Sequence, residues 1–102
     1  RGIMSRSIIQ NKDGCCYMCD LLGIWQQGYT IEEHHCFGGP NRKLSEKYGL
    51  KVYLCPKHHR TGAEAVHQNS DYMQILHEAA QKAFEEHYPD KSFREIFGKN
   101  YL

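Results

Sequence analysis

The spacing of apolar residues along the chain predicts two short strands followed by helices. Residues 29–33 and 50–54 are rich in β-branched and aromatic side chains, which is typical of strands. Apolar residues recur with a helical period over residues 71–87, directly after Asn69 and Ser70, which are suitable N-cap residues. We therefore expect an α+β fold in which the two strands pair as an antiparallel hairpin.

Glycine and proline residues predict where several of these elements begin and end. Gly49 should stop a short helix over residues 42–48, and Gly98 should close a final helix that follows Ser92. Pro56 should open a helix directly after the second strand, because proline is tolerated at the first helical position. The helix at Pro56 should therefore follow the second strand with almost no intervening loop.

Length and composition describe one ordinary globular domain. The 102 residues are 40% hydrophobic and 25% charged, which suits a single domain, 1–102, with a modest core. We expect the core over about residues 14–69, including residues 21–27 around the only tryptophan, and a helical cover over about residues 70–102. A net charge of +1 neither requires nor excludes a nucleic-acid partner. No apolar run has membrane-spanning length and no signal peptide is visible, so no membrane partner is expected.

Cysteine and histidine spacings predict a structural zinc site. Five cysteines without a secretion signal argue against a complete disulfide framework. Two half-sites, with spacings C-x2-C and C-x2-H, supply the ligands that structural zinc prefers. These ligands are Cys16, Cys19, Cys55 and His58. Two alternatives remain open: Cys15 in place of Cys16, and His59 in place of His58 through a C-x3-H spacing.

Histidines also stand in two adjacent pairs that the hairpin would bring together. His34-His35 follows the first predicted strand and His58-His59 follows the second. A neutral imidazole binds metal ions and can take a proton from water near neutral pH. Neighbouring residues on a helix diverge by about 100°, so His58 and His59 cannot easily serve one site. The pairs therefore predict a second metal site, a proton-transfer site, or both.

The order of these motifs resembles the HNH endonuclease family, and in particular small HNH proteins encoded by phages and prophages of Gram-positive bacteria. The similarity lies in five segments and covers about residues 14–102. The segments are HHCFGG at 34–39, SEKYGL at 45–50, LCPKHHR at 54–60, VH at 66–67 and IFGKNYL at 96–102. The resemblance implies a ββα-metal (His-Me finger) core with a zinc knuckle, followed by C-terminal helices.

The resemblance also implies roles for individual residues in DNA cleavage. His35 matches the general base, whereas His34, His59 and His67 match ligands of a catalytic divalent cation such as Mg²⁺, Mn²⁺, Ni²⁺ or Zn²⁺. Leu50 stands where the family has its middle asparagine, so the group that orients the base stays open; a backbone carbonyl could serve. Four basic residues near the motifs are candidate DNA contacts: Arg42, Lys43, Lys57 and Arg60.

The expected function is metal-dependent hydrolysis of DNA phosphodiester bonds by a phage or prophage protein in the cytoplasm of a bacterial host. The expected partner is DNA, with a homodimer or a phage protein as further candidates. Two other functions remain open: a zinc-stabilised nucleic-acid-binding module that does not cleave, and a domain that binds a phage protein through its C-terminal helices. Divalent-dependent cleavage separates the first function from the others, and salt-sensitive DNA binding separates the remaining two.

Overall fold

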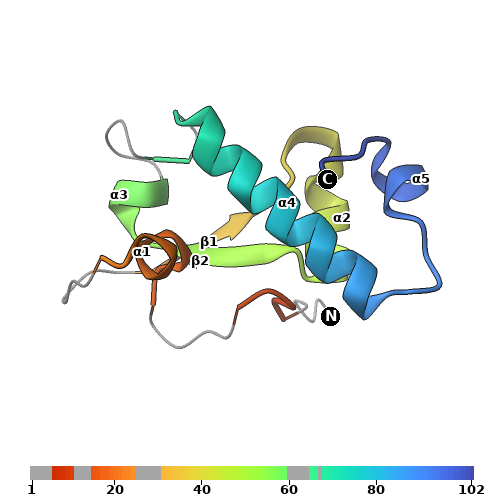
Figure 1. Cartoon of the computed structure of the whole chain (residues 1–102), viewed down its shortest axis with the longest axis horizontal. Coiled ribbons are helices and arrows are strands. Elements are labelled where there is room, and N and C mark those ends of the chain that lie inside the picture. Colours follow the sequence, from red (N-terminus) through yellow and green to blue (C-terminus); the bar gives the residue numbers. More distant parts are fainter. Residues whose placement is uncertain (1–5, 11–14, 25–30, 60–64, 67) are drawn as a thin grey trace.

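A computed structural model describes residues 6–10, 15–24, 31–59, 65–66 and 68–102, and these residues form a mixed helical and strand structure (Figure 1). In chain order the elements are α1 (Tyr17–Leu22), β1 (Glu32–His35), the 3-10 turn η1 (Gly39–Asn41), α2 (Arg42–Tyr48), β2 (Lys51–Leu54), α3 (Pro56–His59), α4 (Ser70–His87) and α5 (Phe93–Phe97). The α+β class predicted from the sequence is confirmed.

Strands β1 and β2 pair in an antiparallel sheet in which His35 lies opposite Lys51 and Glu32 lies opposite Leu54. Because side chains alternate along a strand, Glu33 and His35 share one face of this hairpin and Glu32 and His34 share the other. Strand β1 differs from the prediction of 29–33, since it runs through the histidine pair; residues 29 and 30 lie outside the described residues. Pairing with the buried strand β2 decides its limits, overriding the weak strand propensity of the two glutamates.

Strand β2 forms the centre of the structure, and all of its residues are buried. Val52 and Leu54 belong to the main core together with Leu76, Ala80 and Phe84 of α4. Figure 1 shows α4 crossing the hairpin, with α1 and α3 near one end and α2 and α5 near the other. The helical period of residues 71–87 therefore marks the face of α4 that packs on the sheet.

Residues 6–10, here called the N-terminal segment, cover the edge of β2 that does not pair with β1. They supply hydrogen bonds in place of a third strand. The Ser7 hydroxyl donates to the carbonyl of Lys51, and the Gln10 amide oxygen accepts from the Tyr53 backbone at 2.8 Å. Backbone groups on an open sheet edge would otherwise be exposed to pairing with other chains. Strand β2 is therefore held by β1 along one edge and by the N-terminal segment along the other.

Gly49 ends α2 as predicted and also meets the N-terminal segment. Its φ of 72° is in the left-handed region, and its carbonyl accepts from the Ile8 backbone at 2.9 Å. A Cβ at this position would collide with the carbonyl oxygen of Arg6. Gly98 closes α5 in the same left-handed conformation. The predicted helix ends at both glycines are therefore confirmed.

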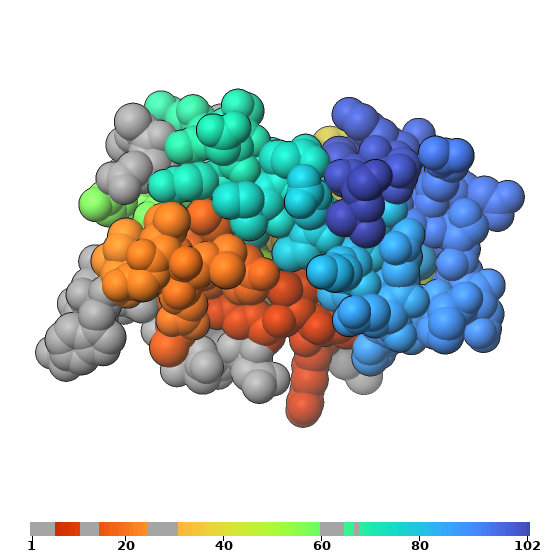
Figure 2. All heavy atoms as spheres, in the orientation of Figure 1, coloured from red at the N-terminus to blue at the C-terminus, as the bar shows by residue number. Residues whose placement is uncertain are grey.

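Helix α1 corrects one expectation about the core. Leu21 is 52% exposed, and Leu22 and Ile24 are also exposed, whereas residues 21–27 were expected to be buried. Residues 25–27 lie outside the described part of the chain. The helix turns Met18 and Cys19 inward, whereas Leu21 and Leu22 lie on its outer side. Figure 2 shows the segment that contains α1, in orange, on the surface of the molecule. None of the helices in the described residues is both long enough and apolar enough to cross a lipid bilayer.

Candidate metal centre and histidine cleft

Three sulfurs and one imidazole nitrogen converge where α1, β2 and α3 meet. Their ligand atoms all lie within 4.8 Å of one another, and they belong to Cys16, Cys19, Cys55 and His58. The Nδ1 atom of His58 lies 3.6 Å from the sulfur of Cys16 and 3.5 Å from that of Cys19. It lies 3.4 Å from the sulfur of Cys55, and the sulfurs of Cys19 and Cys55 are 3.9 Å apart.

These spacings fit a tetrahedral zinc ion. With zinc–sulfur bonds of about 2.3 Å and zinc–nitrogen bonds of about 2.05 Å, the edges of the tetrahedron are about 3.8 Å between sulfurs and about 3.6 Å between sulfur and nitrogen. Each of the four side chains is at most 2% exposed. All cysteines lie in the described residues and none forms a disulfide. The cluster is therefore compatible with a closed, structural metal site.

Local structure explains how short segments aim these side chains inward. Cys16 is the N-cap of α1, and its sulfur accepts from the backbone of Cys19, which closes the C-x2-C turn. The carbonyl of Cys55 accepts from the backbone of His58, so the chain enters α3 immediately after β2. Pro56 occupies the first helical position. Cys15, the alternative to Cys16, lies outside the cluster.

The charge state of the Cys16 thiol depends on burial and on its neighbours. Burial raises the pKa of Cys16, and the neighbouring Cys55 raises it further, although backbone hydrogen bonds act in the other direction. A bound cation reverses this effect, because it stabilises the thiolate that coordinates it. Without a cation, burial favours the neutral thiol of Cys16, whereas a bound metal ion would hold it as the thiolate.

A cleft of about 250 Å³ is lined by the other histidines of the two pairs. Its lining consists of Glu33, His34, His35, Arg42 and His59. The rings of His34 and His59 meet edge to face, with their centroids 5.3 Å apart. The structure thus brings both pairs together and divides the second one, since His58 joins the sulfurs and His59 joins the cleft.

His59 is held by a carboxylate that the sequence analysis did not identify. Its Nδ1–H donates to Glu32 Oε1, with the two atoms 2.7 Å apart. A carboxylate on one imidazole nitrogen fixes the ring and its tautomer, and so directs the lone pair of the other nitrogen toward a metal ion. The sequence gives little indication of this contact, because Glu32 and His59 are 27 positions apart.

His35 also meets an unforeseen carboxylate, on the opposite face of the hairpin. Its Nε2 lies 2.8 Å from Glu46 Oε1. The ammonium group of Lys51 lies 3.2 Å from the other oxygen of Glu46 and 3.1 Å from Glu33. Burial alone would lower the pKa of Lys51, but hydrogen bonds to Glu33 and Glu46 outweigh it and raise the pKa above its ordinary value. Lys51 therefore stays charged.

The candidate DNA contacts differ in their positions. Arg42 lines the cleft, whereas Lys43 and Lys57 are exposed on the surface. Arg60 and the fourth candidate metal-ligating histidine, His67, lie outside the described residues. Arg42 is thus the predicted contact that the structure places beside the imidazoles.

The position of the family's middle asparagine contributes no polar group. Leu50, which stands there, is fully buried in the core. Asn41 is not a substitute, because its amide donates to the carbonyl of Phe97 at 3.2 Å. Cys36 is buried as well, and burial strongly raises the pKa of its thiol, so it remains neutral. Any side chain that orients His35 must come from elsewhere.

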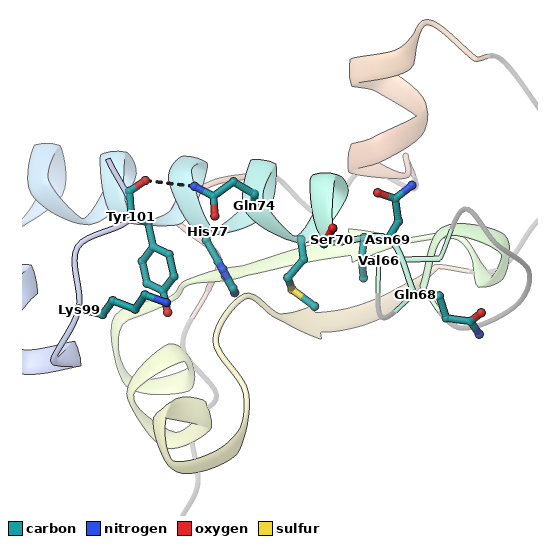
Figure 3. Close-up of a pocket in the computed structure, with 9 residues that line it drawn as sticks. Val66, Gln68, Asn69, Ser70, Gln74, His77, Lys99 and Tyr101 are labelled. Atoms are coloured by element: carbon teal, nitrogen blue, oxygen red, sulfur yellow. Dashed lines mark hydrogen bonds between the residues drawn. The ribbon is translucent and has the colours of Figure 1, made fainter.

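A larger cavity, of about 570 Å³, lies between the first half of α4 and the C-terminal tail (Figure 3). Several of its polar groups already serve the fold. The Gln74 amide donates to the carbonyl of Tyr101 at 3.2 Å, and Asn69 caps α4. Lys99 lies over the ring of Tyr101. We assign no chemistry to this cavity.

Comparison with known proteins adds no further constraint. No protein-family model matches the chain, and neither a curated protein nor a solved structure is detectably similar to it. The functional conclusion therefore rests on the residues and geometry of the cysteine–histidine cluster and the histidine cleft.

Proposed function

We propose that this protein is a metal-dependent DNA endonuclease with an HNH-type ββα-metal core, stabilised by a structural zinc ion. The core consists of β1, β2 and α3. The observation that supports the proposal most directly is the cleft, in which His34 and His35 of β1 meet His59 of α3 beside Arg42. Three imidazoles and a guanidinium in one small cleft provide a base, metal ligands and a phosphate contact.

The zinc cluster and the cleft share helix α3. His58 belongs to the cluster and the adjacent His59 to the cleft, so a metal ion that holds His58 also fixes the backbone of His59. A helix of only four residues has little stability of its own. The structural zinc thus pre-organises one side of the cleft, as a well-positioned catalytic site requires.

In the proposed reaction, His35 takes a proton from a water molecule, the resulting hydroxide attacks the phosphorus, and the 3′ oxygen of the DNA departs. A divalent cation held by His34 and His59 would neutralise charge on the phosphate and on the departing oxygen. Mg²⁺, Mn²⁺, Ni²⁺ and Zn²⁺ are candidates, with His67 as a third candidate ligand. Arg42 contacts a phosphate of the DNA backbone, and Lys43 and Lys57 contact it from the exposed surface; Arg60 is a further candidate contact.

The proposal is tested with supercoiled plasmid DNA, incubated with zinc-loaded protein and each of the four cations in turn. Wild type should nick or linearise the plasmid, and His35→Ala should lose at least ~100-fold in rate, as expected for a general base. His87→Ala is the matched control, because His87 is exposed at the end of α4. Circular dichroism and zinc analysis must show that every variant is folded and loaded.

Two outcomes contradict the proposal. If folded wild-type protein leaves plasmid, branched and single-stranded DNA intact with every cation, the chain is not a nuclease. Salt-dependent DNA binding then separates a nucleic-acid-binding module from a protein-binding domain. If His35→Ala cleaves as fast as wild type, His35 is not the base.

A further inference from the structure

Lys51 is the least expected residue near the cleft, because it lies in the middle of the buried strand β2 and is only 1% exposed. A buried lysine is costly unless its charge is compensated. Replacing a buried ion pair by apolar residues of similar size is often neutral or stabilising. Fold stability alone therefore gives no reason for a lysine at this position.

The carboxylates that compensate the charge of Lys51 include Glu46, which also contacts His35. Lys51 lies opposite His35 in the hairpin, and its ammonium group bridges Glu33 and Glu46. Lys51 Nζ lies within 3.3 Å of both Glu46 oxygens, and one of them, Oε1, also lies 2.8 Å from His35 Nε2. The three side chains form a continuous chain of charge-assisted contacts, which are stronger and more directional than neutral hydrogen bonds.

The backbone that carries Glu46 is itself fixed to the end of β1. The hydroxyl of the preceding residue, Ser45, donates to the carbonyl of Phe37 and accepts from its backbone N–H, both at 3.0 Å. Ser45 is completely buried, and its own carbonyl accepts from the backbone of Leu50 at 2.8 Å. Glu46 is therefore placed by rigid neighbours and not by its own flexible side chain alone.

The spacing of Glu33, His35 and Glu46 would also permit a metal ion, since their ligand atoms lie within 4.8 Å of one another. The ammonium group of Lys51, however, lies 3.1 Å from Glu33 and 3.2 Å from Glu46, where it takes the place of such a cation. An ion there would have to displace a buried, charged lysine. The cluster is thus a hydrogen-bond network and not a second metal centre.

A carboxylate can only accept hydrogen bonds, so the atom that faces Glu46 must be a protonated nitrogen. In the neutral imidazole this places the hydrogen on Nε2 and the lone pair on Nδ1. Within the described residues the imidazole of His35 has no other hydrogen-bond partner. Nδ1 is therefore the nitrogen left to take a proton from water in the cleft that His35 lines.

We propose that Glu46, anchored by the buried Lys51, is the positioning residue of His35: it fixes the imidazole and selects the tautomer whose Nδ1 is the base. This supplies the orienting group that is absent at Leu50. The consequence for cleavage rests on the proposed nuclease function, whereas the tautomer of His35 does not depend on it.

The tautomer is measured first, without DNA, on zinc-loaded protein with ¹⁵N-labelled histidine, at a pH where the imidazole is neutral. The His35 signals are assigned as those lost in His35→Ala. Wild type should show the hydrogen on Nε2 of His35, whereas Glu46→Ala should show a mixture of both tautomers. Glu46→Gln should retain the wild-type tautomer, because its amide oxygen can still accept from Nε2.

Cleavage is measured next, with kcat and KM determined separately. Glu46→Ala should lower kcat by ~10- to 100-fold, by analogy with residues that orient metal-binding histidines, and change KM by less than about twofold. Glu46→Gln should recover part of kcat. Lys51→Met, similar in size and uncharged, leaves the carboxylates of Glu33 and Glu46 without their shared cation, so it should lower the urea midpoint as well as kcat. Glu86→Ala, at an exposed carboxylate of α4, is the control and should match wild type.

The outcomes are distinguishable. The proposal is overturned if the wild-type imidazole carries its hydrogen on Nδ1, if its tautomer is unchanged in both Glu46→Ala and Lys51→Met, or if Glu46→Ala cleaves like wild type. If the tautomer responds as expected but wild type cleaves no DNA, the positioning role stands and the nuclease function fails. If Glu46→Ala does not fold, Glu46→Gln and Lys51→Met decide between these outcomes.

Discussion

Removing the proposed zinc ion from the cysteine–histidine cluster should unfold this protein. The free energy of zinc binding in small structural sites is about 10–16 kcal/mol at neutral pH, whereas domains of this size are stable by about 5–15 kcal/mol. The cluster joins α1, β2 and α3, and its four side chains are at most 2% exposed. Loss of the ion therefore removes a free energy comparable to the total stability.

A matched pair of cysteine variants tests this prediction within one turn of the chain. Cys16→Ser removes a ligand, so we expect loss of stoichiometric zinc and a decrease of more than about 4 kcal/mol in the free energy of unfolding. Cys15→Ser changes the adjacent, half-buried cysteine, which lies outside the cluster, and should cost less than about 1 kcal/mol. Elemental analysis gives the zinc content, and urea unfolding followed by circular dichroism gives the stability.

The reasoning is refuted if Cys16→Ser retains one equivalent of zinc and the wild-type urea midpoint. It is also refuted if chelator-treated wild type, shown to be metal-free, unfolds at the same urea concentration as the loaded protein. If Cys15→Ser rather than Cys16→Ser loses zinc, the cluster has been assigned to the wrong cysteine.

Three further predictions concern the fold. Gly49→Ala should lower the free energy of unfolding by at least about 2 kcal/mol, because a left-handed alanine is strained by about 1–2 kcal/mol and its Cβ would also clash with the carbonyl of Arg6. Gly23 has a similar φ but open space around it, so Gly23→Ala should show the strain alone. Urea midpoints measure both variants. Phe84→Ala should cost about 3–5 kcal/mol in the same assay, because the ring is fully buried. Burial, together with the charge of Lys99, lowers the pKa of His77 in the folded protein. As the pH falls below about 6.5, His77 is therefore protonated in the unfolded chain before it is protonated in the folded one, which destabilises the fold. Wild type should therefore lose more stability than His77→Phe between pH 7.5 and pH 5.5; equal losses would contradict this.

Several parts of the structure followed from local sequence signals. The caps at Asn69 and Ser92 and the helix ends at Gly49 and Gly98 depend on residues within one helical turn. The half-sites C-x2-C and C-x2-H likewise fit ligands onto single tight turns, which is why spacing favoured the residues that cluster, with Cys15 and His59 left as alternatives. Such signals do not require knowledge of the tertiary fold.

Other features did not follow from the sequence, because they depend on contacts between distant residues. Strand β1 extends through the histidine pair since its backbone pairs with β2, although its two glutamates favour other structure. The apolar end of α1 looked like core, but the inward direction of Cys19 turns Leu21 and Leu22 toward solvent. In each case a tertiary contact outweighs the local preference.

The sequence by itself determined which residue types could carry chemistry: paired histidines, spaced cysteines, and strands that deliver them to one end of the fold. Only the tertiary structure decided how these groups are divided and oriented. It assigns His58 to the sulfurs and His59 to the cleft, and it brings Glu46 to His35. The physical reason is that hydrogen bonds and ion pairs act over about 3 Å, so their partners are fixed by packing and not by separation along the chain.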